Sequence, residues 1–472
     1  MANVQLRGAR QRISQLLLTI GVLLAVLVPG TSTVAASASN VFWVALPGNG
    51  IANSSGQGTS CSHPGFNNPQ AAVNASSARP LAIIKVCPGT YGVQIQITTP
   101  NRLLLEAANP KAKPTLQLPA KPRNSTTNCD RVSNKYGGDP PDQEELVVCG
   151  TPSTNVTISG MVIRAAWPHG SCYTNMQGIL IAGGSTLFLA NSAVTATKPI
   201  PDSVCALGNE VVDGMSWTPT LSVGHLKMQA DVLSGYDQLG VRASGKGTTL
   251  SAVNVTVIGE GPKAPQLQTG IQVQYGALGQ ISHSRISDNL CGPGGFRGCA
   301  PGVPALSTGT GVVFAEASHG SFLDYSTISG NGVGATYSCS GGVATCDGSW
   351  LKSHPDVSFI GDKFIGETSV DLAIYDGRAV GRGNVLSNAQ TGYLFFQEAS
   401  LIFPADYASS GDRVSGMSTA AVEIWDSPPN YRGHAGVATL TNCKLSGNPG
   451  ATVKGSILNY SPDYVITLKG DS

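Results

Sequence analysis

Residues 281–289, ISHSRISDN, carry the repeat that decides the fold. They fit a template of an apolar residue, a small residue, a second apolar residue and a closing Asn: Ile281, Ser284, Ile286 and Asn289. The template starts again at four later positions, with acidic replacements at the second of them: Leu323, Phe359, Val380 and Leu440. The spacings are 42, 36, 21 and 60 residues, and all but the second are close to multiples of about 20, as in stacked repeat units.

Apolar and polar residues alternate around these repeats, as in VTISGMVIRAA from Val156 and LSAVNVTVIG from Leu250. Strand side chains point alternately to opposite faces, so this alternation predicts strands. The Gly-Asn and Asp-Asn pairs that close the repeats tolerate the left-handed backbone that the corner of a coil requires. Charged residues make up only 12% of the chain, which leaves few of the strong helix formers Glu and Lys. The sequence therefore predicts an all-β solenoid.

The N-terminus is predicted to be a secretory signal peptide. Arg7, Arg10 and Arg12 precede an apolar run over 16–28, and Ala36-Ser37-Ala38 offers a cleavage site. This run is shorter than the roughly 20 residues that span a bilayer, which favours cleavage over a membrane anchor. We therefore expect a signal peptide over 1–38 and one domain over 39–472. The protein should be secreted and extracellular, with the periplasm or the cell surface as alternatives.

Eleven cysteines in an exported chain indicate disulfide bonds. Proximity along the chain suggests five pairs: Cys61–Cys87, Cys129–Cys149, Cys172–Cys205, Cys291–Cys299 and Cys339–Cys346. Cys443 occupies the small position of the template, so we interpret it as a buried thiol rather than a nucleophile. Irregular stretches at 119–145, 196–220 and 290–308 contain cysteines and are predicted to be loops stapled by these bonds.

The stretch from Cys61 to Glu106 adds a more specific pattern. A helix is expected near Pro69–Ala75, and a strand from Ile83 runs into Pro88-Gly89-Thr90-Tyr91. This pattern resembles the N-terminal coil of right-handed β-helix proteins of the pectin-lyase-like superfamily, and the later S-x-I-S-x-N units resemble its generic repeats. The resemblance implies a single-stranded right-handed parallel β-helix with a short N-terminal capping helix, the cap covering about 60–105, and with disulfide-stapled loops.

That superfamily includes pectate lyases, polygalacturonases, pectin methylesterases, alginate-processing enzymes and proteins without demonstrated activity. Their active-site signatures are absent here: Gly224-His225-Leu226 departs from the polygalacturonase G-H-G, and His354-Pro355-Asp356 departs from the epimerase D-P-H-D. Two hypotheses therefore stay open. The protein binds or processes polysaccharide, as a lyase or glycoside hydrolase if it is an enzyme, or it is a non-catalytic extracellular surface or matrix protein that binds glycans or proteins.

Ionisable residues are densest between His354 and Arg382. In SVDLAIYDGRAVGRG, alternation places Val370, Leu372 and Ile374 on one face and Asp371, Ala373 and Tyr375 on the outward face. The candidate catalytic residues are Asp371, Asp376 and Arg378, with Tyr375 as a candidate sugar-binding residue. The alternative is a solvated face with Asp–Arg pairs, each contributing about 1 kcal/mol or less.

A second group of candidate substrate-binding residues lies near the C-terminus: Glu423, Trp425, Asp426, Tyr431 and Arg432. Aromatic rings with polar edges are platforms for a pyranose ring, and Glu423 and Trp425 share a strand face by their spacing. Ordinary loop packing is the alternative.

The partner expected from these features is a polysaccharide or a cell-surface glycan. The formal net charge of +1 shows no basic signature for nucleic acid. No cofactor is evident and no metal site is predicted, although a lyase could use Ca²⁺ to neutralise a sugar carboxylate. We expect a monomer with no membrane span after signal cleavage.

Overall fold

The computed structural model describes residues 40–48, 56–99, 101–120, 143–166, 176–197, 223–236, 238–263, 267–291, 309–339, 357–375, 377–397, 405–426, 436–446, 457–459 and 464–470. Phe42–Ser472 form one compact unit, and nearly all of the preceding segment, with the predicted signal peptide, lies outside the described residues. The described helices include none that is both long and apolar enough to cross a membrane.

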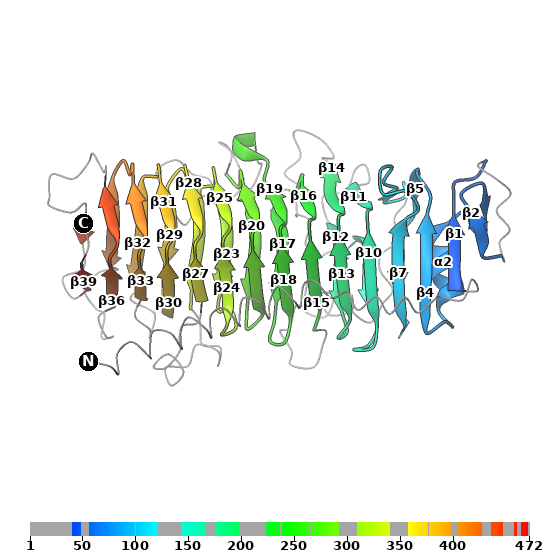
Figure 1. Cartoon of the computed structure of the whole chain (residues 1–472), viewed down its shortest axis with the longest axis horizontal. Helices are drawn as coiled ribbons and strands as arrows, with labels where there is room; N and C mark the ends of the chain where they lie inside the picture. The colour runs from blue at the N-terminus through cyan, green and yellow to red at the C-terminus, as the bar shows by residue number, and fades with distance from the viewer. Residues whose placement is uncertain are drawn as a thin grey trace, which may run out of the picture. The chain divides into compact units, whose positions relative to one another are not determined.

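Parallel strands form three sides of a solenoid, here called sides 1, 2 and 3 (Figure 1). Side 1 is one sheet of 14 strands. Its strands are β1 (Val41–Val44), β4 (Leu81–Val86), β7 (Arg102–Ala107), β10 (Asn155–Ser159), β13 (Thr186–Ala190), β15 (His225–Gln229), β18 (Thr249–Val253), β21 (Leu278–Ser282), β24 (Ser321–Asp324), β27 (Val357–Ile360), β30 (Gly377–Arg382), β33 (Ala405–Ser410), β36 (Val437–Thr441) and β39 (Val465–Lys469).

Side 2 is a sheet of 12 mostly three-residue strands. They are β5 (Thr90–Gly92), β8 (Thr115–Gln117), β11 (Val162–Ala166), β14 (Ala193–Thr197), β16 (Val232–Ser234), β19 (Thr256–Ile258), β22 (Arg285–Ser287), β25 (Thr327–Ser329), β28 (Lys363–Ile365), β31 (Val385–Ser387), β34 (Arg413–Ser415) and β37 (Lys444–Ser446).

Side 3 consists of a three-stranded and an eight-stranded sheet. The first contains β6 (Ile95–Ile97), β9 (Gln143–Cys149) and β12 (Met176–Ala182). The second contains β17 (Leu239–Ser244), β20 (Thr269–Gln274), β23 (Thr310–Ala315), β26 (Val333–Ser338), β29 (Val370–Ile374), β32 (Thr391–Gln397), β35 (Ala420–Asp426) and β38 (Ile457–Asn459). A short 3₁₀ helix, η3 (Gly261–Lys263), follows β19. The all-β parallel fold predicted from the repeats is confirmed.

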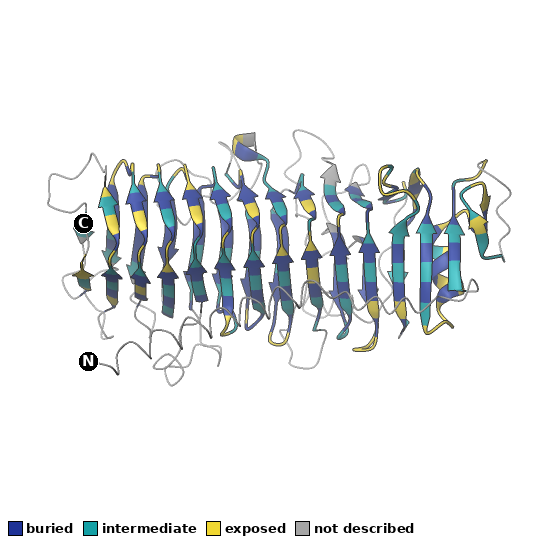
Figure 2. Ribbon diagram, in the orientation of Figure 1, coloured by how far each residue is buried: buried dark blue, intermediate teal, exposed yellow. Residues whose placement is uncertain are grey.

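Strands of successive coils pair in register, so template positions stack on one another. Ile281 pairs with Leu323, and Leu323 with Phe359, as the template requires. The template start at Val380 is wrong by one residue, because Phe359 pairs with Gly381. The inward residues fill a continuous apolar core, seen as alternating buried and less buried bands along each strand (Figure 2).

Both corners that flank side 2 are built from the residue types that the repeats supply. The chain turns from side 1 to side 2 through one left-handed residue per coil, such as His283 (φ 51°), Tyr325 (φ 47°) or Gly361 (φ 68°). The small residue that follows is buried, and its side chain accepts the backbone N–H of the preceding coil, as Ser284 Oγ does from Val255 N at 3.1 Å. Left-handed Gly330 likewise ends side 2 in its coil.

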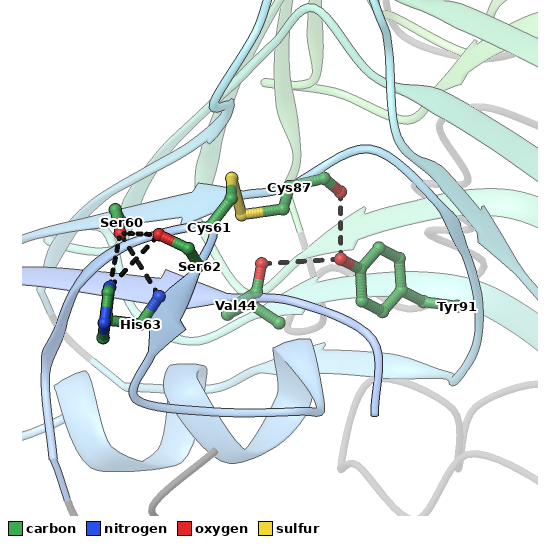
Figure 3. The surroundings of a disulfide bond; sticks show 7 residues. All are labelled: Val44, Ser60, Cys61, Ser62, His63, Cys87 and Tyr91. Carbon is green, nitrogen blue, oxygen red and sulfur yellow. Dashed lines mark hydrogen bonds between the residues drawn. A yellow bond between two sulfur atoms is a disulfide. The ribbon is translucent and has the colours of Figure 1, made fainter. Parts of the chain in front are cut away.

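The N-terminal cap matches the prediction. Helix α2 (Pro69–Ser76) begins after Asn68, whose side chain accepts the N–H groups of Gln70 and Ala71, and a two-stranded pair, β2 (Gly58–Ser60) and β3 (His63–Pro64), precedes it. Cys61 and Cys87 form a disulfide (Figure 3). Beside it, the Tyr91 hydroxyl donates to the Cys87 carbonyl oxygen at 2.9 Å.

Other cysteines agree with the oxidised state that was expected. Cys149, Cys291 and Cys339 are disulfide-bonded, and their predicted partners Cys129, Cys299 and Cys346 lie outside the described residues. The pair Cys172–Cys205 and most of the three loops that were to hold these bonds also lie outside them. Cys443 is a buried cysteine that forms no disulfide bond, as its template position predicted.

Candidate functional site

The outer face of side 3 carries a row of polar side chains that ends in three aromatic side chains. The strand register aligns one outward position across seven consecutive coils, from β17 to β35: Ser244, Gln274, Ala315, Ser338, Tyr375, Phe396 and Trp425. Tyr375 is the residue that follows the end of β29. We call this the side-3 row. At the roughly 4.8 Å spacing of strands, it extends about 29 Å along the solenoid.

Three aromatic residues end the side-3 row. The ring centroids of Tyr375 and Phe396 are 5.5 Å apart, and Phe396 pairs with Trp425 on the next strand. Tyr375 is buried, whereas Phe396 and Trp425 stay partly exposed and pack against the apolar cluster that contains Val370 and Leu394. Burial raises the pKa of Tyr375 well above its usual value, so its hydroxyl stays protonated at neutral pH.

Glu423 fixes the tryptophan. The indole Nε1–H of Trp425 donates to Glu423 Oε1 at 2.6 Å, and the Thr391 hydroxyl donates to Oε2 at 2.7 Å. Both carboxylate oxygens are therefore engaged in holding neighbouring side chains. Trp425 is positioned by a charge-assisted hydrogen bond as well as by packing.

The other half of the row is polar. Gln272 Nε2 donates to Gln274 Oε1 at 2.6 Å, and Gln274 Nε2 donates to Ser244 Oγ at 3.3 Å. Arg242 pairs with Gln272 on the neighbouring strand. Ser244 and Gln274 are buried, whereas Gln272 and Arg242 are partly exposed. The exposed amide and guanidinium can pair with sugar hydroxyls while the aromatic rings contact the apolar face of the sugar.

The structure places Tyr375, Glu423 and Trp425 on one surface, whereas the sequence pattern assigned them to two separate groups. Phe396 was missed because no pattern in the sequence singles it out; only the register between β32 and β35 joins it to Trp425. The same holds for Gln272 and Gln274.

The predicted outward position of Asp371 is wrong. Asp371 is fully buried, at the strand position held by Gly311, Gly334 and Gly392 in neighbouring coils. A Cβ added at Gly311 would lie 2.8 Å from Ile328 Cγ2 and 3.1 Å from Asn331 Nδ2, both core atoms. Side chains at this position therefore point into the solenoid, because β29 departs from regular alternation at its second residue.

Inside the solenoid, Asp371 lies beside Glu367. Burial, then the charge of Glu367, raise the pKa of Asp371 well above its usual value, and the backbone of Ser387 offsets part of the rise. Burial also raises the pKa of Glu367 to about 8. Neither oxygen of Asp371 meets a hydrogen-bond partner in good geometry. Asp371 is a buried acid rather than a group that reaches substrate.

The candidate catalytic residues are not brought together. Arg378 lies on side 1, where it faces Asp406 in the register and lowers the pKa of that carboxyl, against a larger upward effect of burial. Asp376, Tyr431 and Arg432 lie outside the described residues, as does the side chain of Asp426. Asp371 in the core and Arg378 on side 1 cannot act on one substrate.

A hollow lies on side 1. A shallow groove of about 690 Å³ crosses the strands from β4 to β15 and is lined by residues that include Arg102, Asn155, Thr157, Phe188 and Lys227. It contains cations, hydroxyls and one aromatic ring, but its lining includes no carboxylate. It can bind polar ligands, yet it has no acid for proton transfer.

Acids on the outer face of side 3 are far apart. Among the described side chains of side 3, these acids are Glu145 on β9 and Glu423 on β35. Glu145 is fully buried, and burial raises its pKa well above the usual value. Nine coils separate β9 from β35, or roughly 43 Å. Hydrolysis needs two carboxyl groups about 5 to 9.5 Å apart. The described part of the chain also gathers no group of three or more metal-ligating side chains.

Comparison with known proteins shows the fold. No family model and no curated protein matches the chain. A structure of XylC with xylose has 9% identity and a TM-score of 0.50, over 91% of this chain and 86% of that one. The Agl-KA catalytic domain has 12% identity and a TM-score of 0.52, over 84% of this chain and 64% of that one. A mutant of the periplasmic alginate epimerase AlgG has 11% identity and a TM-score of 0.43, over 86% and 82%. The chain has the fold of a right-handed parallel β-helix.

Proposed function

We propose that this protein is exported and binds polysaccharide along the outer face of side 3. The side-3 row carries the proposal, because it joins an amide-lined half to the aromatic half in one line. Each sugar of a linear glycan presents an apolar ring face, which an aromatic side chain can cover, and hydroxyls, which polar side chains can pair with by hydrogen bonds. XylC, which shares the fold, has a structure with xylose, and this supports a sugar ligand.

We prefer binding to catalysis because of where the carboxyl groups of the described residues lie. The described residues of side 3 offer no pair of carboxyl groups within reach of one glycosidic bond, and Asp371 is enclosed in the core. Glu423 is occupied by Trp425 and Thr391. Turnover as a lyase, with Ca²⁺, or as a glycoside hydrolase is the alternative, and a direct assay separates it from binding.

Export is part of the proposal. The predicted signal peptide, the Cys61–Cys87 disulfide and the three further disulfide-bonded cysteines fit an oxidising location such as the extracellular space or the periplasm. Detection of the protein outside the cytosol, with its N-terminus at Ser39, tests this. A full-length protein retained in the cytosol contradicts it.

The binding test uses the purified oxidised protein and a panel of soluble polysaccharides. Trp425→Ala removes one ring and frees Glu423, so we expect at least about a tenfold loss of affinity for the glycan that binds, since such contacts contribute on the order of 1 kcal/mol or more each. Phe322→Ala is the matched control, because Phe322 is a partly exposed aromatic residue on side 1. Equal affinity of the Trp425→Ala variant and the parent protein would overturn the assignment.

Turnover is followed on the same panel, with and without Ca²⁺, by ultraviolet absorbance of unsaturated uronides and by reducing ends. Binding without either signal is the expected result. A signal that survives in the Glu423→Gln variant would place an active centre elsewhere in the chain.

A further inference from the structure

Side 2 presents a line of cations that the side-3 proposal does not use. One outward position carries, in six consecutive coils, Arg285, Thr327, Lys363, Val385, Arg413 and Lys444, each paired with the next. All four basic side chains are exposed. The line covers five strand intervals, or about 24 Å. We call it the basic row.

No acid opposes the basic row on its own sheet. The 12 strands of side 2 contain no Asp or Glu, and the ion pair seen among the described residues, Lys85–Glu106, lies on side 1. The exposed acid closest in sequence is Asp288, just beyond the end of β22. In a chain whose net charge is +1, like charges in single file are unfavourable unless an anion offsets them.

An aromatic ledge adjoins the N-terminal end of the basic row. His283 and Tyr325 occupy the left-handed corner position of adjacent coils, and their ring centroids are 5.4 Å apart. The side chain of Tyr325 is 56% exposed. Its ring lies on Gly361, where an added Cβ would come within 2.8 Å of it, so the next coil offers no side chain to cover the ring edge.

We infer that side 2 is a separate anchoring surface for a linear anionic glycan laid along the solenoid axis. The four cations of the basic row, with Thr327 and Val385 between them, pair with acidic groups that repeat along a chain. The His283–Tyr325 ledge contacts a sugar ring beside Arg285. Ser and Thr side chains on the outward positions of the same strands, such as Ser329 and Thr327, supply hydroxyl contacts. The inference is independent of the side-3 proposal, since the residues of the two surfaces do not overlap.

A glycan fits this surface better than a nucleic acid does. Nucleic-acid sites are broad basic patches on proteins with a strong positive balance, whereas here the cations form one file on a nearly neutral chain. Electrostatic binding of this kind should weaken steeply as salt is added, because the cations are fully exposed.

The test is binding to immobilised polygalacturonate at low ionic strength, with the carboxyl-reduced form of the same polymer as the uncharged control. The triple variant Lys363→Gln/Arg413→Gln/Lys444→Gln should lose about tenfold or more in affinity. The matched control Lys111→Gln/Lys246→Gln/Lys469→Gln removes the same charge from exposed positions off side 2 and should bind like the parent. Tyr325→Ala should lower the affinity without changing its salt dependence.

Each outcome is decisive. Unchanged binding by the side-2 triple variant, or an equal loss in the control triple, overturns the anchoring surface. Tighter binding of a DNA oligonucleotide than of polygalacturonate, lost in the side-2 triple, replaces the glycan by nucleic acid. The Trp425→Ala variant should keep its affinity for polygalacturonate, so failure of the side-3 proposal and failure of this one give different results.

Discussion

At the scale of single residues, Asp371 is a side chain that lowers the stability of the fold. Its equivalents in neighbouring coils are Gly334 and Gly392, which bring no side chain into the corner. Asp371 instead adds a carboxyl group beside Glu367, in a buried site where neither of its oxygens meets a hydrogen-bond partner in good geometry. An unsatisfied buried polar group costs about 1–3 kcal/mol.

This pair makes stability depend on pH. The pKa of Glu367 rises to about 8, and that of Asp371 also rises, so the native state holds these protons more tightly than the unfolded chain. Stability from these groups is complete below the unfolded values and is lost as pH rises through about 8. We expect Asp371→Ala to raise the unfolding temperature at pH 8 and to flatten its fall from pH 5 to pH 8, measured by circular dichroism.

Ala421 occupies the equivalent position in β35, so alanine fits there. Glu106→Gln, at a partly exposed carboxylate on side 1, controls for the loss of one negative charge. A variant less stable than the parent protein at pH 8 would show that Asp371 contributes favourable contacts.

The error over Asp371 has a physical origin. Strict alternation in VDLAI treats Asp371, Ala373 and Tyr375 alike, and this is right for Ala373 and Tyr375, which pack in the outer cluster. The sequence did contain a signal, since glycine stands second in the strands at Thr310, Val333 and Thr391. Only the register between coils, which the sequence does not give, shows that Asp371 is their equivalent.

At the scale of elements, the corner between sides 1 and 2 is held by a ladder of buried polar side chains. Ser326 N donates to Asp362 Oδ1 at 2.9 Å, Asp362 N to Asn384 Oδ1 at 2.9 Å, and Asn384 N to Asp412 Oδ1 at 2.7 Å. Each rung therefore ties one coil to the next through a backbone donor. The template predicted the small residues here but gave no reason for acids, which serve as acceptors and not as catalysts.

Asp412 is the rung with the most partners. Its Oδ2 also accepts the hydroxyls of Tyr393 and Ser409, each at 2.6 Å. Asp412→Ala removes the acceptor of the Asn384 backbone N–H and of the Tyr393 and Ser409 hydroxyls, so we expect a loss of about 3 kcal/mol or more in the free energy of unfolding. Urea denaturation measures it. Cys443→Ser, at the next rung, should be nearly neutral because Ser284 and Ser326 already serve this position; an equal loss in both variants would contradict the ladder argument.

At the scale of the whole molecule, the repeats predicted the solenoid because each coil contacts only its neighbours, so a local pattern fixes a global architecture. The binding surfaces could not be predicted in the same way. The side-3 row and the basic row join residues from coils far apart in sequence, and a shift of one residue in register, as at Val380, moves a side chain from surface to core.

Because each coil contacts only its neighbours, removal of one bond should destabilise mainly the adjacent coils. The Cys61–Cys87 bond closes a separation of 26 residues within the N-terminal cap, and a loop of that size contributes roughly 3 kcal/mol in the chain-entropy model. We expect Cys61→Ser/Cys87→Ser to reduce amide hydrogen-exchange protection in α2, β4 and β7, measured by mass spectrometry. Amide protection in β27 to β36 and glycan binding at the side-3 row should stay unchanged. Each coil contacts only its neighbours, and several coils separate these regions from the N-terminal cap. A uniform fall in protection along the chain would show instead that the β-helix unfolds as one cooperative unit.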